Sequence, residues 1–420
     1  MNEPDDKQLS DSDSATGLLE RTEAEQQPAA AVPPDLPTEY AADANTDALE
    51  VPRIPHLFWH PLLAVGWIIR TAFGIVTLIL LLAIVAAIPL VNFLALGYLL
   101  DVEGRVARTG RLRYAFPLLD LAPKVGSIVL GIWVCVFPLR LMSGAVADAR
   151  LIDPTSTATA VMQWTTTVLA CLVALHLCAA LGRGGGFWTF LRPIKNIRWL
   201  IRSIREGFDW GAAEAHVSRF LTGLRLKHHF LLGVYGFIGA LIWLILPTAL
   251  FAASNSTEGP SVLVTVIGGA ALVVVLGWLP FLQAHFAAEN RLTAMFELKQ
   301  IRQLYRRAPL AWMIATVGIY VLSLPLYLLK VVAPPQDAMW FVTIVFIVSI
   351  YPARVVAGWA YSRAVKKEHG AWFGFRWLSR SVCFPLLSLY VFLLFFTQFI
   401  AEHGKRVLFE HHVFLLPVPF

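Results

Sequence analysis

The sequence predicts an all-α fold, a polytopic transmembrane helix bundle with basic amphipathic interfacial helices on the cytoplasmic face. Hydrophobic residues make up 57% of the 420 residues and charged residues only 15%, against about 45–50% and about 25% in soluble domains. Several windows also exceed the ~18 apolar residues that a membrane-spanning helix needs. The uneven distribution of Lys and Arg between these windows predicts their orientation.

Residues 1–52 are predicted to form a disordered acidic tail. The first 50 residues hold thirteen acidic and two basic side chains, with many Pro and Ala residues and few large apolar ones. This composition buries too little apolar surface to offset the conformational entropy lost on folding. The tail also lacks the basic start and apolar stretch of a secretory signal. We expect it to be available to a membrane or cytoplasmic protein partner.

Residues 53–403 are predicted to form the transmembrane domain, and residues 404–420 a short C-terminal tail. An apolar region covers residues 62–100. The later windows that are long and apolar enough to cross a bilayer lie at about 125–146, 161–181, 230–251, 261–283, 310–330, 339–360 and 383–401.

Region 62–100 allows two arrangements, because its 39 residues are too many for one span and barely enough for two. Pro89 and Asn92 indicate a break in the helix. One arrangement is a single long span with the N-terminus outside, and the other is a hairpin that returns to the cytoplasm. We favour the hairpin, because the acidic tail carries no signal for export.

Lys and Arg residues concentrate in alternate connections. The rich segments are 101–124, 183–229, 289–309 and 363–382, whereas the connections between them hold almost none. Cytoplasmic connections carry the Lys and Arg excess. The four basic segments are therefore predicted to lie on the cytoplasmic side of the membrane.

One basic segment has a pattern typical of a helix lying in a membrane interface. In RPIKNIRWLIRSIREGFDW, residues 192–210, isoleucines recur every three or four residues and basic residues follow them one position later. Basic stems on the shoulder of an apolar stripe suit a phospholipid surface, although a solvated face of a soluble helix shows similar spacing. The predicted anionic-lipid contacts are Lys195, Arg198, Arg202 and Arg205, with Lys299, Arg302 and Arg306 in a second segment of the same phase.

The basic segments also indicate an internal repeat. Residues 197–205 and 298–306 precede spans with an internal proline, in LILPTAL and LSLPLYL. GRVARTGRLR likewise precedes CVFPLRL, and YSRAVKKEHG precedes SVCFPLL. The predicted unit is a span, a basic cytoplasmic helix and a kinked span, all copies in one orientation. Chance similarity among apolar segments is the alternative.

Two polar residues are predicted to lie within spans. Arg140, in CVFPLRLMSG, and His176, in CLVALHLC, are ionisable residues in apolar surroundings, where such residues often mark a pathway or a partner. Arg140 could instead reach the outer interface near Asp148, and His176 could be a hydrogen-bonded packing residue. No catalytic, cofactor-binding or metal-binding constellation is predicted, and the apolar shoulders of the basic segments argue against nucleic acid.

The segment IPLVNFLALGYLLDVEGRVARTGRLRYAFPLLDLAPKVG, residues 88–126, resembles an uncharacterised family of prokaryotic multi-spanning membrane proteins, domain of unknown function 4013. The family's motif runs from Ile-Pro through Gly-Tyr-Leu and a basic helix to a Gly and a Leu-Pro/Asp element. The matching residues are Pro89, Asn92, Gly97, Tyr98, Arg105, Arg108, Gly110 and Asp120, whereas Phe116-Pro117 departs from Leu-Pro. The resemblance implies a bacterial setting and the hairpin, and no reaction.

These patterns predict an integral, non-enzymatic membrane protein that engages anionic lipid headgroups of the phospholipid bilayer and organises the membrane or a partner complex. The alternative is a transporter of a small or lipid-like solute built from parallel repeats, which the proline breaks, Arg140 and His176 favour. An enzyme acting on lipid is a third interpretation.

Overall fold

A computed structural model of the protein describes residues 61–207, 214, 218, 220–253, 260–331, 339–400 and 404–417. The predicted acidic tail, residues 1–52, lies outside these residues. Within them every regular element is a helix and there is no strand. The prediction of an all-α helical bundle is confirmed.

Eight helices are long and apolar enough to cross a membrane. They are α3 (Pro61–Ala87), α5 (Ala122–Ile152), α6 (Thr157–Gly182), α10 (Leu226–Phe251), α11 (Pro260–Glu289), α13 (Pro309–Val331), α14 (Met339–Val365) and α15 (Phe373–Ile400). Large apolar side chains are exposed along most of them, and such surface requires a hydrocarbon solvent. The chain is an integral membrane protein.

Region 62–100 forms a helix, a tight turn and half of a second helix. Helix α3 ends at Ala87, Leu90 in the turn has a positive φ of 66°, and α4 (Asn92–Thr109) follows and packs against α3. The helix breaks here because Pro89 has no backbone N–H to donate. Helix α4 continues nine residues past the predicted region, so the segment expected to be interfacial at 101–124 begins inside the bundle.

Helix α4 is enclosed by protein. Residues Ala95–Ala107 are all buried, and α4 packs against α3, α10, α11 and α14. Glycines permit the close approach. A Cβ atom on Gly97 would strike the carbonyl oxygen of His229, and one on Gly233 would strike that of Phe93. Small residues at such crossings let helix backbones touch in membrane proteins.

The C-terminal ends of α4, α11 and α14 meet at what we call the basic end of the bundle. Arg108 donates through Nη1 to the carbonyl oxygens of Ala287 and Ala288, at 3.0 and 3.2 Å, and Lys366 Nζ to that of Thr109 at 3.1 Å. Cations at helix C-termini satisfy the last carbonyls and interact favourably with the helix dipole. The three helices therefore end at the same side of the bundle.

Helices α4 and α11 are similar in sequence and in the way they end. Leu96-Gly97-Tyr98-Leu99 corresponds to Leu276-Gly277-Trp278-Leu279, at an offset of 180 residues. After each helix comes a residue with positive φ (Gly110, 67°; Asn290, 53°), then an extended Arg and a 3₁₀ helix, η1 (Leu112–Ala115) or η2 (Leu292–Phe296). The shared backbone at matching positions goes beyond a chance likeness of apolar residues.

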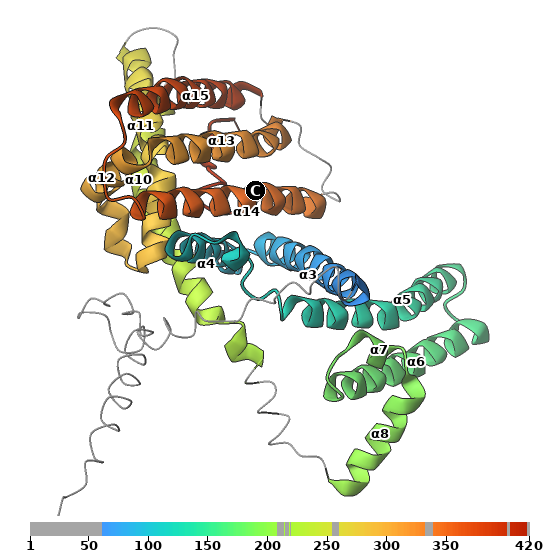
Figure 1. Ribbon diagram of the computed structural model, residues 1–420. Coiled ribbons are helices and arrows are strands. Elements are labelled where there is room, and N and C mark those ends of the chain that lie inside the picture. Colours follow the sequence, from blue (N-terminus) through green and yellow to red (C-terminus); the bar gives the residue numbers. More distant parts are fainter. Residues whose placement is uncertain are drawn as a thin grey trace, which may run out of the picture. The chain divides into compact units, whose positions relative to one another are not determined.

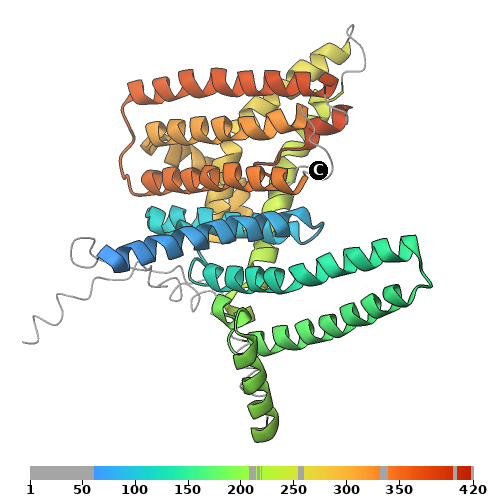
Figure 2. The ribbon, with the colours of Figure 1, turned by 90° about the vertical axis from the view of Figure 1, so that its right-hand side faces the viewer.

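Figures 1 and 2 show α13, α14 and α15 side by side, with α10 and α11 running across them. Helices α5 and α6 form an antiparallel hairpin, followed by the short α7 (Phe187–Phe190) and by α8 (Pro193–Glu206), which packs on α6 and α7. Helix α12 (Leu298–Arg307) connects η2 to α13 and packs on α11, α13 and α14. The bundle therefore carries two short basic helices with different neighbours.

The C-terminal segment folds into the bundle. The 3₁₀ helix η4 (Gly404–Phe409) packs on α15, and residues His411–Leu415 are all buried. The sequence predicts only a short tail at 404–420, of which 418–420 lie outside the described residues. The apolar stretch VLFEHHVFLLP explains the difference, because it buries aromatic and aliphatic side chains.

Candidate functional site

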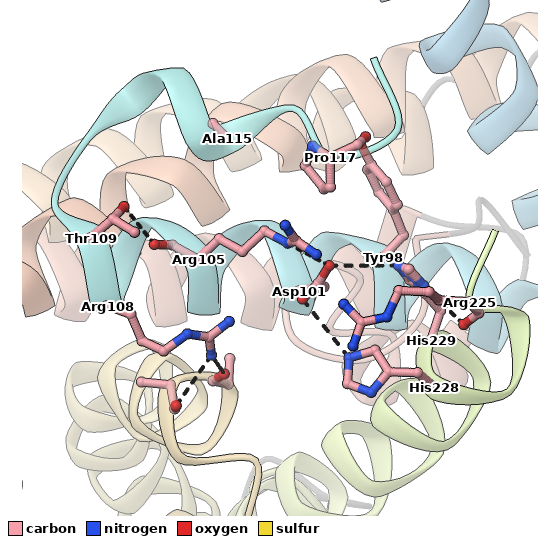
Figure 3. Close-up of polar contacts among 12 residues, drawn as sticks. Tyr98, Asp101, Arg105, Arg108, Thr109, Ala115, Pro117, Arg225, His228 and His229 are labelled. Atoms are coloured by element: carbon pink, nitrogen blue, oxygen red, sulfur yellow. Dashed lines mark hydrogen bonds and ion pairs between the residues drawn. The ribbon is translucent and has the colours of Figure 1, made fainter. Parts of the chain in front are cut away.

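One face of α4 carries a buried acid that meets two histidines of α10 (Figure 3). Asp101, which is 4% exposed, accepts a hydrogen bond from Arg105 Nε at 2.9 Å. Its carboxylate oxygens lie 3.8 Å from His228 Nε2 and 3.6 Å from His229 Nε2. His228 is the most exposed member, at 24%. His228 is therefore the member through which the cluster reaches the protein surface.

Asp101 is held as a carboxylate by its neighbours. Burial alone would raise the pKa of Asp101, but His228, Arg105 and His229 together hold it well below its usual range. Beside it, burial raises the pKa of Tyr98 well above the ordinary value. The cluster thus pairs a stable negative charge with a neutral phenol.

The Tyr98 hydroxyl secures the chain that follows α4. It donates to the carbonyl oxygen of Pro117 at 2.6 Å, and the Tyr351 hydroxyl of α14 donates to that of Ala115 at 2.6 Å. The two hydroxyl oxygens lie 3.3 Å apart. Two carbonyls of a non-helical segment therefore find partners inside the protein, as buried backbone groups require.

The opposite face of α4 carries a second acid, Glu103, about 200° around the helix from Asp101. Arg354 Nη1 of α14 donates to Glu103 Oε2 at 2.9 Å and to Gln283 Oε1 of α11 at 2.7 Å. Arg354 Nη2 donates to the carbonyl oxygen of Val413 at 2.6 Å, and Gln283 Nε2 to that of Phe414 at 2.8 Å. This cluster fastens the C-terminal segment to three helices.

Glu103 and Gln283 occupy matching positions in the two similar helices, 180 residues apart. Both accept a hydrogen bond from the same guanidinium group. Burial raises the pKa of Glu103 to about 7, although Arg354 opposes the rise. Glu103 has only Arg354 beside it, whereas Asp101 has Arg105 and two histidines, and this difference explains their opposite pKa shifts.

A third buried group lies at the basic end. His285 of α11, which is 0% exposed, bonds Glu297 Oε2 through Nε2 and the Tyr361 hydroxyl through Nδ1, each at 2.8 Å. His285 occupies the position in α11 that Arg105 occupies in α4. These contacts join α11, α14 and the start of α12, so their first role is to hold the bundle together.

Helix α8 presents three faces. Asn196, which is 0% exposed, attaches it to the α6–α7 region by donating to the Thr189 carbonyl oxygen at 2.8 Å and accepting from Arg183 at 2.5 Å. Ile194, Ile197, Ile201 and Ile204 form a second face and are 47–72% exposed. Lys195, Arg198, Arg202 and Arg205 form the third face and are also exposed.

Helix α12 differs from α8 because its apolar face is covered by protein. Ile301, Leu304 and Tyr305 are buried, whereas Lys299, Arg302 and Arg306 are exposed. The two helices share the same phase in sequence, yet only α8 leaves an apolar stripe uncovered among the described residues.

The two polar residues predicted within spans lie apart from these clusters. Arg140 is exposed on α5, near Ser143, whose hydroxyl donates to the Arg140 carbonyl oxygen at 2.9 Å. His176 Nε2 lies 2.8 Å from the Phe190 carbonyl oxygen, and its Nδ1 lies 3.3 Å from Asn196 Nδ2. His176 therefore helps to seat α7 and α8 on α6, as a packing histidine does.

Sequence reasoning missed the buried charges of α4 and Arg354. Their signal was the run GYLLDVEGR, in which charges alternate with glycines and apolar residues after a break. In the described part of the chain, no group of three or more His, Cys, Asp and Glu residues could hold a metal ion. Comparisons with protein-family models, curated proteins and solved structures found no match.

Proposed function

We propose that this integral membrane protein engages anionic lipid headgroups through α8, without catalysing a reaction, and thereby organises the membrane or a partner complex. The single observation that carries the proposal is the exposed isoleucine stripe of α8 beside its exposed basic stripe. We further propose that the protein lies in a bacterial inner membrane and that the acidic tail binds a protein partner. We also propose that the chain belongs to the family that residues 88–126 resemble.

The two stripes suit the boundary between acyl chains and headgroups. Isoleucine side chains exposed to water would lose the free energy that burial supplies, whereas in an interface they reach hydrocarbon. Each Lys or Arg near an anionic surface contributes about 1 kcal/mol. Because Asn196 fixes the third face of α8 to the protein, the other two faces are presented in one orientation.

The transporter alternative rests on the similarity of α4 and α11 and on the buried charges between them. The two intramembrane residues that the sequence offers for transport, Arg140 and His176, support this alternative less. Arg140 lies on an exposed surface, and both ring nitrogens of His176 face partners of α7 and α8. The lipid-contact function therefore has the stronger geometric support.

Reversing three charges on α8 is expected to lift its isoleucine stripe from the bilayer. The full chain with Arg198→Glu, Arg202→Glu and Arg205→Glu would be placed in nanodiscs containing anionic lipid. A single cysteine introduced by Ile201→Cys would carry an environment-sensitive fluorophore. The four cysteines, which are free, would first be replaced by serine. We expect blue-shifted emission from the parent and water-like emission from the variant, because attraction of about 3 kcal/mol becomes repulsion.

The matched control reverses Lys299, Arg302 and Arg306 on α12, whose apolar face is buried in protein. This variant should leave emission at position 201 unchanged. If the α8 variant also kept blue-shifted emission, or if the parent showed water-like emission in anionic nanodiscs, headgroup binding through α8 would be wrong.

A further inference from the structure

A groove of about 330 Å³ lies between α11, α13 and α15, with α12 at one end. Its walls include Trp278, Trp312 and Tyr305, together with aliphatic side chains. Such a mainly apolar site with a few polar groups at one end is typical of small-molecule binding. None of its lining residues belongs to α8, so the groove is separate from the surface proposed above.

The groove is polar at one end and apolar at the other. Helices α11 and α15 line it in opposite directions, so Trp278 and Arg380 mark the basic end and Val273 and Leu387 the deep end. From Ser379 to Leu387 the wall runs about 12 Å along α15. A lipid headgroup at the basic end would thus place an acyl chain along the deep end of the groove.

Two buried polar atoms at the basic end have no oxygen or nitrogen partner among the described residues. Ser379 lines the groove and is 1% exposed, and its Oγ has only the weakly bonding Cys383 thiol beside it. Arg376 Nε, one turn earlier on α15, is unpaired. Buried polar atoms are normally satisfied, so these two indicate a polar group that the protein itself does not supply.

Positive charge is concentrated at the same end. Arg376 and Arg380 are the fourth and eighth residues of α15, close to its N-terminal end, where the helix dipole favours an anion. The Arg380 guanidinium lies 5.9 Å from the ring centre of Tyr305. The Ala371 amide donates to the Arg306 carbonyl oxygen at 2.8 Å, which brings the basic edge of α12 alongside.

We infer that this groove binds one anionic glycerophospholipid. Its phosphate lies against Arg380 and Ser379, with the charge of Arg376 one turn away, and one acyl chain lies between Val273 and Leu387. Basic pockets between transmembrane helices recognise anionic lipid headgroups in this way. This site holds a single lipid molecule, whereas α8 contacts a surface, so either can exist without the other.

Native mass spectrometry of the delipidated full chain in detergent tests the site, with phosphatidylglycerol and phosphatidylcholine as probes. We expect one phosphatidylglycerol to bind at least tenfold more tightly than phosphatidylcholine. Arg380→Glu should weaken phosphatidylglycerol binding about 30-fold, because each cation near a phosphate contributes about fivefold and reversal adds repulsion. Val274→Trp, which fills the groove, should weaken both lipids.

Three controls make the result specific. Lys367→Glu changes an exposed cation outside the groove and should leave binding unchanged. The triple reversal on α8 should also leave it unchanged, which separates this site from the proposed function. Glycerol phosphate without acyl chains should not compete. Equal binding of the two lipids, or phosphatidylglycerol binding that survives both Arg380→Glu and Val274→Trp, would overturn the inference.

Discussion

At pH 8, Arg354→Met is expected to lower the free energy of unfolding by about 3–5 kcal/mol, because it breaks a buried ion pair. The variant leaves oxygens of Glu103, Gln283 and Val413 without their donor. Each unsatisfied buried group costs about 1–3 kcal/mol. The measurement is reversible unfolding of the full chain in mixed micelles of mild detergent and dodecyl sulfate.

Two further variants test the reason for this loss. Arg363→Met, on the same helix but exposed, should change the free energy of unfolding by less than about 0.5 kcal/mol. The double variant Arg354→Met with Glu103→Gln should be more stable than Arg354→Met alone, because no uncompensated carboxylate is then buried. Equal stability of Arg354→Met and the parent would contradict the role of this cluster.

Gly97→Leu should separate α4 from α10 and lower stability by about 3 kcal/mol, at the upper end of the range for overpacking. Any Cβ atom at this position would strike the carbonyl oxygen of His229, and backbone cannot move aside as a flexible side chain can. The same shift would draw His228 and His229 away from Asp101. Thermal unfolding of the full chain measures the effect.

Gly144→Leu supplies the matched control, because nothing lies within 4 Å of a Cβ atom at Gly144 on α5. We expect little change there, since the added side chain faces open apolar surroundings. If both leucine variants unfolded at the parent's temperature, the tight crossing of α4 and α10 would be wrong.

The predicted spans correspond to helices that extend beyond them, because helices continue past their apolar windows into charged turns. The window 383–401, for example, falls within α15 except for residue 401, which lies outside the described residues, and α15 begins ten residues earlier at Phe373. Apolar length therefore located the spans, while their ends depended on local capping and on partners at the basic end.

Helix α4 could not be recognised as a buried helix from its own sequence. Asp101, Glu103, Arg105 and Arg108 make it resemble a polar connection, and hydropathy does not select it as a span. What makes it suitable for the interior is Arg354, far along the chain, together with the histidines of α10. Such long-range neutralisation of charge has no periodic signal.

The amphipathic pattern of α8 was visible in sequence, but its difference from α12 was not. Both segments repeat the same order of apolar and basic residues. Only the fold shows that α12 buries Ile301 and Leu304 against protein, whereas α8 leaves Ile197 and Ile201 exposed. Which apolar face meets lipid is decided by tertiary packing.

The most direct measurement is labelling of two single-cysteine variants at neighbouring positions of α8 with a membrane-impermeant maleimide, in intact cells and in inside-out vesicles. With the four cysteines replaced, Arg198→Cys should react only in inside-out vesicles. Ile197→Cys, one residue away, should react in neither preparation until detergent removes the bilayer. Labelling of both positions to the same extent in inside-out vesicles, or of either position in intact cells, would contradict an interfacial α8 on the cytoplasmic side.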